Sequence, residues 1–154
     1  MKKIATVVLS LVVMTGTLFA KENLKVKFGQ NSKTFTMVTL DNPTANQIVH
    51  DVGNQSWNLP IYDFDNYTGW EYFQYYDISR RYKYESNPVK VTEAKAGEVY
   101  YSHPNRIILF YHDAKVNMQL TKIGDIQATP EFIKAVEDNP ALEYWGNKIV
   151  TISK

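Results

Sequence analysis

The chain has 154 residues, a formal net charge of +1, 14% aromatic residues and no cysteine. A charge this close to neutral gives no electrostatic basis for nucleic-acid binding, which depends on clustered Lys and Arg. Without cysteine there are no disulfides and no thiol chemistry, so stability must come from burial, to which the aromatic side chains contribute most.

Residues 1–20 have the pattern of a secretory signal peptide. Lys2 and Lys3 form a positive n-region, an apolar run follows, and the small residue Ala20 precedes a charged pair. The apolar run is shorter than the ~20 residues of a membrane-spanning helix, and no second run of that kind follows. We therefore expect cleavage after Ala20, which leaves residues 21–154 as a single periplasmic or secreted domain without a transmembrane segment.

The first part of this domain predicts a β-hairpin and then a helix. Apolar residues alternate in Leu24–Phe28 and again in Phe35–Thr39, with a Gly-Gln-Asn-Ser turn between them. Asn42 can cap a helix, Pro43 suits its first turn, and apolar residues at helical spacing continue as far as Val52. We expect one short amphipathic helix that packs its apolar face on the sheet.

Eleven aromatic residues crowd the stretch from Trp57 to Tyr84. They predict two strands, about 56–64 and 70–76, joined by an Asp-Asn-Tyr-Thr-Gly turn at 65–69. A long surface loop, Ile78 to Pro88, is expected to follow.

These aromatic residues have two interpretations. In strands they fill a core, but the domain has more tyrosines than a small interior can satisfy. Tyr75, Tyr76, Tyr82 and Tyr84 are therefore expected to reach the surface, close to two consecutive arginines at positions 80 and 81. Rings interleaved with Arg would make a good recognition surface for a peptide, a glycan or a planar ligand, and the other interpretation, packing and solvation alone, stays open.

The second half predicts further short strands and a second helix. Val99–Ser102 and Arg106–Tyr111 are strongly β-prone, and strands at 120–123 and 149–153 complete the pattern. A Thr-Pro-Glu sequence at 129–131 starts a helix, which Asn-Pro ends. Seven or eight strands with two helices predict a mainly β fold, a small closed barrel. In such a barrel one face of Val99–Ser102 lies inside and a helix or loop covers the other.

The residue types give little support to catalysis. The three histidines (His50, His103 and His112) share no ligand spacing, so no metal site is predicted. There is no nucleophile elbow and no phosphate-binding loop, so no catalytic residue and no cofactor are predicted either.

Three acids are close in sequence around the turn at 65–69. Asp63, Asp65 and Glu71 could form a calcium site or an acid/base pair, but such residues more often cap backbone groups in turns.

Five segments occur in the order found in the bacterial cyclophilin-like domain family, and the sequence resembles that family over nearly all of residues 21–154. The segments are Asn42–Ala45, Leu59-Pro60, Ala96–Tyr101, Asn105–Tyr111 and Lys122–Ile126. The resemblance implies a closed β-barrel of cyclophilin-like fold with two short capping helices. A longer, Tyr-rich stretch at 70–88 departs from the family pattern.

The resemblance does not extend to the prolyl isomerase site. Cyclophilins carry a Phe-His-Arg strand and a Gln-Gly-Gly-Asp segment, and neither is present here. The three arginines, at positions 80, 81 and 106, follow no Phe-His pair. A fold can persist without its site, so the family implies the fold and not the activity.

We interpret the domain as a binding module for a small molecule or peptide. The expected site is a Tyr-lined pocket at one barrel mouth, with Tyr62, Tyr101 and Tyr111 as walls and Arg106 for an anionic group, beside the loop at 78–88. Two other classes stay open: an enzyme, either a divergent isomerase or one that uses Tyr and Arg, and an interaction subunit that uses the aromatic loop as its patch. The sequence leaves the ligand and the oligomeric state undefined.

Overall fold

The computed structural model describes residues 22–62, 71–140 and 147–154, except for the side chains of Tyr62 and Asn147. The expected signal peptide, the turn at 65–69 and the carboxylates of Asp63 and Asp65 lie outside these ranges. The described residues form nine strands and two helices: β1 (Asn23–Phe28), β2 (Thr34–Thr39), α1 (Pro43–Asn54), β3 (Trp57–Tyr62), β4 (Phe73–Asp77), β5 (Val89–Ala94), β6 (Glu98–Ser102), β7 (Arg106–Phe110), β8 (Ala114–Ile126), α2 (Pro130–Glu137) and β9 (Asn147–Ser153).

The predicted hairpin and both helix starts are confirmed. β1 pairs antiparallel with β2, with Leu24 opposite Met37. The Asn42 side chain accepts a hydrogen bond of 2.9 Å from the Ala45 N–H and so caps α1. Thr129 caps α2 in the same way through the Phe132 N–H, at 3.2 Å.

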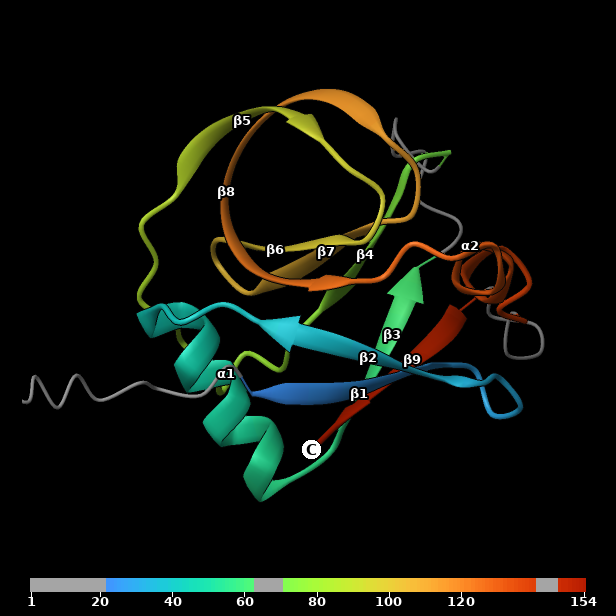
Figure 1. The fold of residues 1–154 in the computed structure, drawn as a ribbon. Coiled ribbons are helices and arrows are strands. Elements are labelled where there is room, and N and C mark those ends of the chain that lie inside the picture. Colours follow the sequence, from blue (N-terminus) through green and yellow to red (C-terminus); the bar gives the residue numbers. More distant parts are fainter. Residues whose placement is uncertain (1–21, 63–70, 141–146) are drawn as a thin grey trace, which may run out of the picture.

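Eight strands close into a ring in the order β2-β1-β9-β3-β4-β7-β6-β8, because β8 pairs back onto β2 with Met37 opposite Ile126. The mainly β barrel with two short helices is therefore confirmed (Figure 1). β8 is long enough for two roles: its first half pairs with β5 and its second half pairs with β6 and β2.

Two hydrophobic clusters lie on opposite faces of β4, β7 and β6. Side chains that alternate along each strand go to an inner cluster, which includes Tyr76, Tyr101 and Ile107. Their neighbours go to an outer cluster, which includes Tyr75 and Ile108. The period-2 geometry of the strands thus divides consecutive aromatic residues between two cores.

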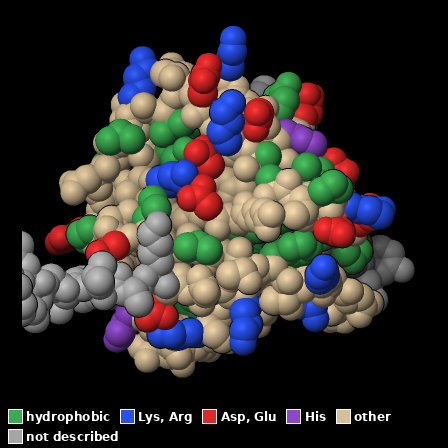
Figure 2. Space-filling model, viewed as in Figure 1, with side chains coloured by type: hydrophobic (Ala, Val, Ile, Leu, Met, Phe, Trp, Pro, Cys, Tyr) green, Lys and Arg blue, Asp and Glu red, His purple; other side chains and the backbone are tan. Residues whose placement is uncertain are grey.

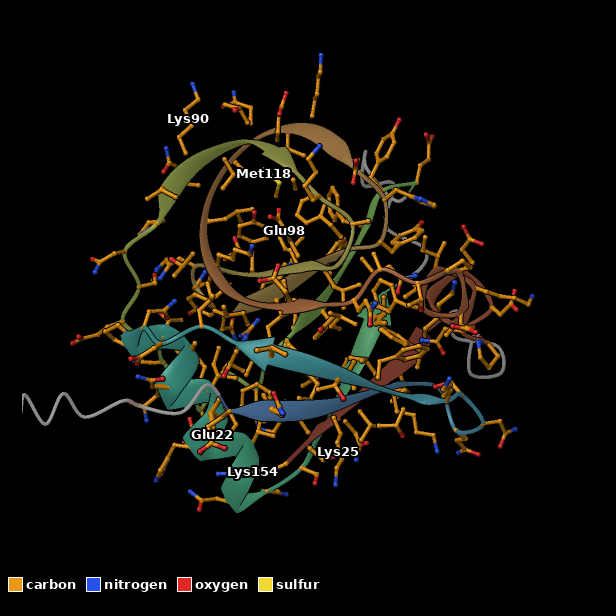
Figure 3. The ribbon with its side chains drawn as sticks, viewed as in Figure 1. Glu22, Lys25, Lys90, Glu98, Met118 and Lys154 are labelled. Carbon is orange, nitrogen blue, oxygen red and sulfur yellow. The ribbon has the colours of Figure 1, made fainter. Side chains whose placement is uncertain are left out.

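The outer cluster is covered by β5 and the first half of β8, which curve over it (Figure 1). Met118 of β8 packs on this cluster, and Figure 3 shows it inside the curve that β5 and β8 describe. Both faces of β6 are apolar, as expected, but strands cover its outer face where a helix or loop was predicted.

The helices pack on the inner cluster. α1 buries Ile48, Val49 and Val52 against it. On α2, the ring of Phe132 lies 5.9 Å from Phe28 and meets it edge-on. These contacts extend the core beyond the strands at two places on the ring.

Two expectations about the aromatic middle were wrong, the exposure of three tyrosines and the surface position of the loop. Tyr75 and Tyr76 are each 1% exposed and Tyr84 is 6% exposed, so these three do not reach the surface. Ile78–Pro88 has no helix or strand, as predicted, but Ile78 is 2% exposed, so it is not simply a surface loop. The charged residues next to Tyr84 in the sequence suggested exposure. In an extended segment, however, alternate side chains can point into the core while their neighbours stay in solvent.

Strand limits also differed from expectation. β5 was not predicted, and β8 extends well beyond the predicted strand at 120–123. Both depend on pairing between distant segments, since Val89 lies opposite Leu120.

Charges on the surface are mixed in sign. Figure 2 shows Lys and Arg interspersed with Asp and Glu on the face in view. Lys154 pairs with Glu22 at 3.4 Å, which joins the end of the chain to the start of β1; both are labelled in Figure 3. Within the described ranges, neither helix has the length and apolar character to cross a membrane.

Candidate functional site

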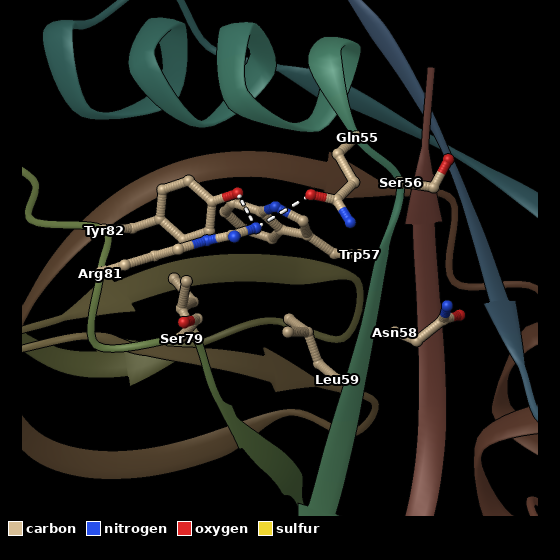
Figure 4. A pocket seen from close by; sticks show the side chains of 9 residues that line it. Gln55, Ser56, Trp57, Asn58, Leu59, Ser79, Arg81 and Tyr82 are labelled. Carbon is tan, nitrogen blue, oxygen red and sulfur yellow. Dashed lines mark hydrogen bonds between the residues drawn. The ribbon is translucent and has the colours of Figure 1, made fainter.

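A pocket of ≈ 260 Å³ lies where the end of α1, the start of β3 and the segment after β4 meet. Figure 4 shows it from close by. Polar and apolar side chains share its wall: Gln55, Ser56, Trp57, Asn58, Leu59, Ile78, Ser79, Arg81 and Tyr82.

Backbone hydrogen bonds fix the segments that form this pocket. Gln55 ends α1, and its N–H donates to the Asp51 carbonyl at 3.1 Å. Trp57 starts β3 opposite Ile152 of β9. Across the pocket, the Ile78 N–H donates to the Asn105 carbonyl at 2.9 Å, and the Asn105 amide donates back to the Ile78 carbonyl at 2.6 Å.

Aromatic contacts hold the segment after β4 against β3. The ring centroids of Trp57 and Tyr82 are 5.3 Å apart, and the rings of Tyr82 and Tyr84 stack at 6.2 Å. The Tyr84 ring in turn meets the Tyr101 ring edge-on at 5.6 Å. This row of rings connects the pocket to the barrel interior, so the pocket wall is anchored in the core.

Arg81 crosses the mouth of the pocket and is held in place on two sides. Its Nη2 donates to Gln55 Oε1 at 3.0 Å and to the Tyr82 hydroxyl at 2.7 Å (Figure 4). The guanidinium carbon also lies 4.7 Å from the Tyr82 ring centroid, within cation–π range. Neutral groups therefore orient this cation, and within the described ranges no carboxylate pairs with it.

Trp57 supplies the most unusual group in the wall. Its side chain is 4% exposed, and its Nε1–H has no hydrogen-bond partner among the described residues. A buried donor left without a partner costs about 1–3 kcal/mol. An acceptor in the pocket would remove that cost.

Among the predicted site residues whose side chains the structure describes, Tyr101 and Tyr111 lie in the inner cluster, whereas Arg106 contacts a ring of the outer one. Tyr101 and Tyr111 both belong to the inner cluster and are 1% and 7% exposed. The Tyr101 hydroxyl donates to the Pro104 carbonyl. Tyr62 lies in β3, but its side chain is outside what the structure describes.

Arg106 is on the opposite face of the sheet from Tyr101. Its guanidinium carbon lies 4.2 Å from the ring centroid of Tyr75, which is in the outer cluster, and its Nε donates to Asp77 Oδ1 at 2.8 Å. A carboxylate already neutralises this arginine. The arginine that lines the pocket described here is Arg81, whereas Arg106 had been expected to line the site.

Sequence reasoning identified part of this site. A recognition surface was one of the two interpretations of the segment at 78–88, with its Arg and Tyr side chains, and Arg81 and Tyr82 do line the pocket. Gln55 and Trp57 were missed. Their only local signal is a Trp placed directly after a helix end, which is equally typical of a core position.

Three buried tyrosines have pKa values above the ordinary one. Burial raises the pKa of Tyr84, and the hydrogen bond and charge of Asp51 raise it further. Burial also raises the pKa of Tyr76 and of Tyr101. These phenols keep their protons at neutral pH and offer no ready tyrosinate for acid/base catalysis.

The histidines are on separate elements: His50 on α1, His103 between β6 and β7, and His112 after β7. His50 lies 3.2 Å from Asp51, and His112 lies 3.2 Å from Glu137. No group of three or more His, Cys, Asp or Glu residues that could hold a metal ion occurs in the part of the chain that the structure describes.

Two solved structures share this fold. McbB, determined in complex with tryptophan, superposes with a TM-score of 0.60 at 15% identity over 85% of this chain, which spans 44% of McbB. The hypothetical protein AF2241 from Archaeoglobus fulgidus superposes with a TM-score of 0.55 at 15% identity, over 86% of this chain and 94% of AF2241. At this identity the likeness shows the fold alone. Among curated protein sequences, none is significantly similar to this chain.

The profile of the cyclophilin-like family matches residues 27–153. The match runs from the first strand to the last and agrees with the closed ring and its two helices. It confirms the family that the five ordered segments indicated, and the chain therefore belongs to the cyclophilin-like family.

Proposed function

We propose that the protein is a binding module for a small molecule or a peptide, and that its site is the pocket between Trp57, Arg81 and Tyr82. The observation that carries this proposal is made at Trp57: its side chain lines the pocket, and its Nε1–H is a buried donor without a partner among the described residues. Buried polar groups in folded proteins are nearly always hydrogen-bonded, so an exception in a pocket wall supports binding of an acceptor there.

The size and lining of the pocket define the class of ligand. Its ≈ 260 Å³ is slightly less than the roughly 300–1,000 Å³ of pockets for drug-sized ligands, so the ligand, or the part of it that enters, is small. Leu59 and Ile78 are 6% and 2% exposed and provide an apolar wall, while Trp57 and Tyr82 provide ring edges and faces. A planar apolar body with one polar group suits this wall. That the structural neighbour McbB was solved with tryptophan adds support of a general kind.

A second pocket of ≈ 260 Å³ has less to offer a ligand. It lies between the end of β5 and the start of β8, and it contains Lys95 and Asp113. Those two side chains pair at 3.5 Å, and Asp113 also accepts from the Ala96 N–H at 2.9 Å. Glu93 and Lys115 also line it, so both charges are represented twice in its wall and no one sign of ligand charge is favoured.

The proposal is tested by titrating the protein with small planar compounds, neutral and charged, and following the ¹H–¹⁵N indole resonances. Trp57→Phe assigns the Trp57 resonance by its loss. We expect at least one class of compound to shift the Trp57 Nε1–H and the backbone amides of 78–82.

Ser79→Phe is the matched variant for this test. Ser79 is exposed and lines the pocket, so a ring there fills the space without entering the core. Binding should be lost in this variant. Binding that persists in Ser79→Phe, or a full panel that moves no resonance of the pocket, would overturn the proposal.

Export is a separate part of the proposal and rests on the n-region at Lys2 and Lys3, the apolar run and Ala20. We infer that the mature protein begins at Lys21 and is periplasmic or secreted. N-terminal sequencing of protein from non-cytoplasmic fractions tests this. Met1 retained on cytoplasmic protein would contradict it.

A further inference from the structure

We infer that the group held in this pocket is a carboxylate on a small planar body, bound jointly by the Trp57 Nε1–H and the Arg81 guanidinium. This inference rests on the proposed function, which requires only that the pocket binds a small ligand. It adds the charge and the geometry of the group that is recognised.

The first argument is charge. None of the nine side chains that line the pocket is Asp or Glu, and Arg81 is the charged one among them. Arg106 shows the contrast, since Asp77 neutralises it at 2.8 Å. An arginine fixed by neutral groups at a pocket mouth attracts an anion and repels a cation.

The second argument is the balance of donors and acceptors. Gln55 Oε1 and the Tyr82 hydroxyl already accept from Arg81, and Asn58 Oδ1 accepts from the Thr151 hydroxyl at 2.8 Å. Most of the polar hydrogens that remain on the lining side chains are N–H donors, on the Trp57 indole, the Arg81 guanidinium and the Gln55 and Asn58 amides, while the Ser56 and Ser79 hydroxyls can donate or accept. A carboxylate accepts only, and therefore complements such a wall.

The third argument is shape. A carboxylate has two oxygens in one plane, so one can accept from the indole N–H while the other accepts from the guanidinium. The apolar surface of Leu59 and Ile78 and the Trp57 and Tyr82 rings then contact a flat body attached to it. Two sources carry this chemistry, a free aromatic acid and the C-terminal carboxylate of a peptide.

The experiment compares two probes of the same shape, indole-3-acetate and its neutral amide, indole-3-acetamide. Dissociation constants are measured by calorimetry, and the Trp57 Nε1–H is followed by ¹H–¹⁵N spectra. We expect the acid to bind about tenfold or more tightly than the amide, since charge-assisted hydrogen bonds are the stronger ones. The indole proton should shift downfield with the acid.

Arg81→Gln should remove most of the difference between acid and amide. Arg80→Gln is its matched control, because Arg80 is the exposed neighbour that changes the net charge equally and does not line the pocket. In Arg80→Gln the acid should still bind at least several-fold more tightly than the amide. Trp57→Phe should weaken the acid more than the amide.

The outcomes separate the two proposals. Equal binding of acid and amide would overturn the carboxylate inference and leave the binding module intact, whereas no binding by any planar compound would overturn both. If Arg81→Gln does not fold, the comparison of acid with amide on the unaltered protein still decides. Gly-Gly-Trp with a free or an amidated C-terminus then assigns the source: only a peptide preferred over the free acid supports a chain terminus.

Discussion

Tyr84 links the pocket segment to both the barrel interior and α1. Its ring contacts Trp57, Tyr82 and Tyr101, and its hydroxyl donates to Asp51 Oδ2 of α1 at 2.8 Å. Charged residues flank it in sequence, which is why it was expected at the surface. The Tyr84 ring is nevertheless part of the core, and its hydroxyl attaches the pocket segment to α1.

Truncation of Tyr84 should therefore be costly. We expect Tyr84→Ala to lower the free energy of unfolding by about 3–5 kcal/mol, because a large buried ring is removed. Tyr84→Phe should cost about 1 kcal/mol, the value of one hydrogen bond. Urea melts measure both, with Tyr72→Ala as the control, since Tyr72 is 42% exposed and should change stability by about 0.5 kcal/mol or less. A Tyr84→Ala variant as stable as the control would contradict this placement.

Glu98 makes the stability of the protein depend on pH in the acid range. Burial opposes its ionisation, but the Lys95 N–H, the Tyr100 hydroxyl and Lys122 all bind the carboxylate and together lower its pKa below the ordinary 4.5. Because the folded-state pKa is lowered, the unfolded chain takes up the proton first. The stability that Glu98 contributes is present above pH 4.5 and is lost as the pH falls through the lowered value.

Glu98→Gln should reveal this contribution. We expect the variant to be less stable than the unaltered protein at pH 7 and to lose less of its stability on acidification below pH 4.5. Thermal melts across this range measure the difference. Glu93→Gln, an exposed carboxylate of β5, is the matched control and should retain the steep dependence. An equally steep loss in Glu98→Gln would show that other carboxylates cause it.

At the scale of elements, local signals predicted local structure. Asn42 with Pro43 and Thr129 with Pro130 marked both helices because a cap and a first-turn proline act within four residues. β5 carried no such signal, since its burial comes from pairing with the first half of β8, outside the ring. Elements whose burial depends on distant partners were the ones that the sequence did not predict.

The turn between β5 and β6 shows how one residue fixes the junction of two elements. Gly97 has φ +92°, and a Cβ there would lie 2.0 Å from the Ile126 carbonyl oxygen at the end of β8. Its N–H donates to the Phe110 carbonyl, and its own carbonyl accepts from Ile126. The ring closes through β8 at this point, so the glycine is required by both backbone conformation and space.

Gly97→Ala should lower the free energy of unfolding by at least about 2 kcal/mol, because strain and a backbone clash coincide. Gly53→Ala is the matched control: Gly53 is in α1, and a Cβ there meets only Lys154 Cδ at 3.4 Å. That substitution should be stabilising by about 0.5 kcal/mol, from helix propensity. Chemical denaturation of both variants measures the contrast, and similar stabilities would refute it.

At the scale of the whole molecule, the candidate site depends on ring closure. Trp57 and Arg81 come from segments that meet because β3 pairs with β9 and because Asn105, between β6 and β7, holds Ile78. Neither contact can be derived from residue spacing. The sequence could therefore predict a recognition segment rich in Arg and Tyr, but it could not say which arginine faces a pocket and which is neutralised.

The strands that cover the outer cluster also bear on isomerase activity. β5 and the first half of β8 cover the outer face of β4, β7 and β6, so the apolar side chains of that face are buried where a prolyl peptide would have to bind. Arg106, the arginine on that face, is occupied by Asp77 and by the Tyr75 ring. The sequence motifs that place an Arg and a Gln over a prolyl bond in cyclophilins are also absent.

We therefore expect the protein not to accelerate cis–trans exchange of a proline peptide above the uncatalysed rate. Because β5 and β8 cover that face and Asp77 already pairs with Arg106, the twisted amide in the transition state gains no stabilisation over the ground state. A chymotrypsin-coupled assay measures the exchange, with a cyclophilin at equal concentration as the positive control. Asp77→Asn provides a sharper arm, because it frees Arg106 from its carboxylate and should still give no activity while β5 and β8 cover the sheet. Acceleration comparable to that of the cyclophilin, lost in Arg106→Ala, would show that this face opens and that the fold has kept the activity.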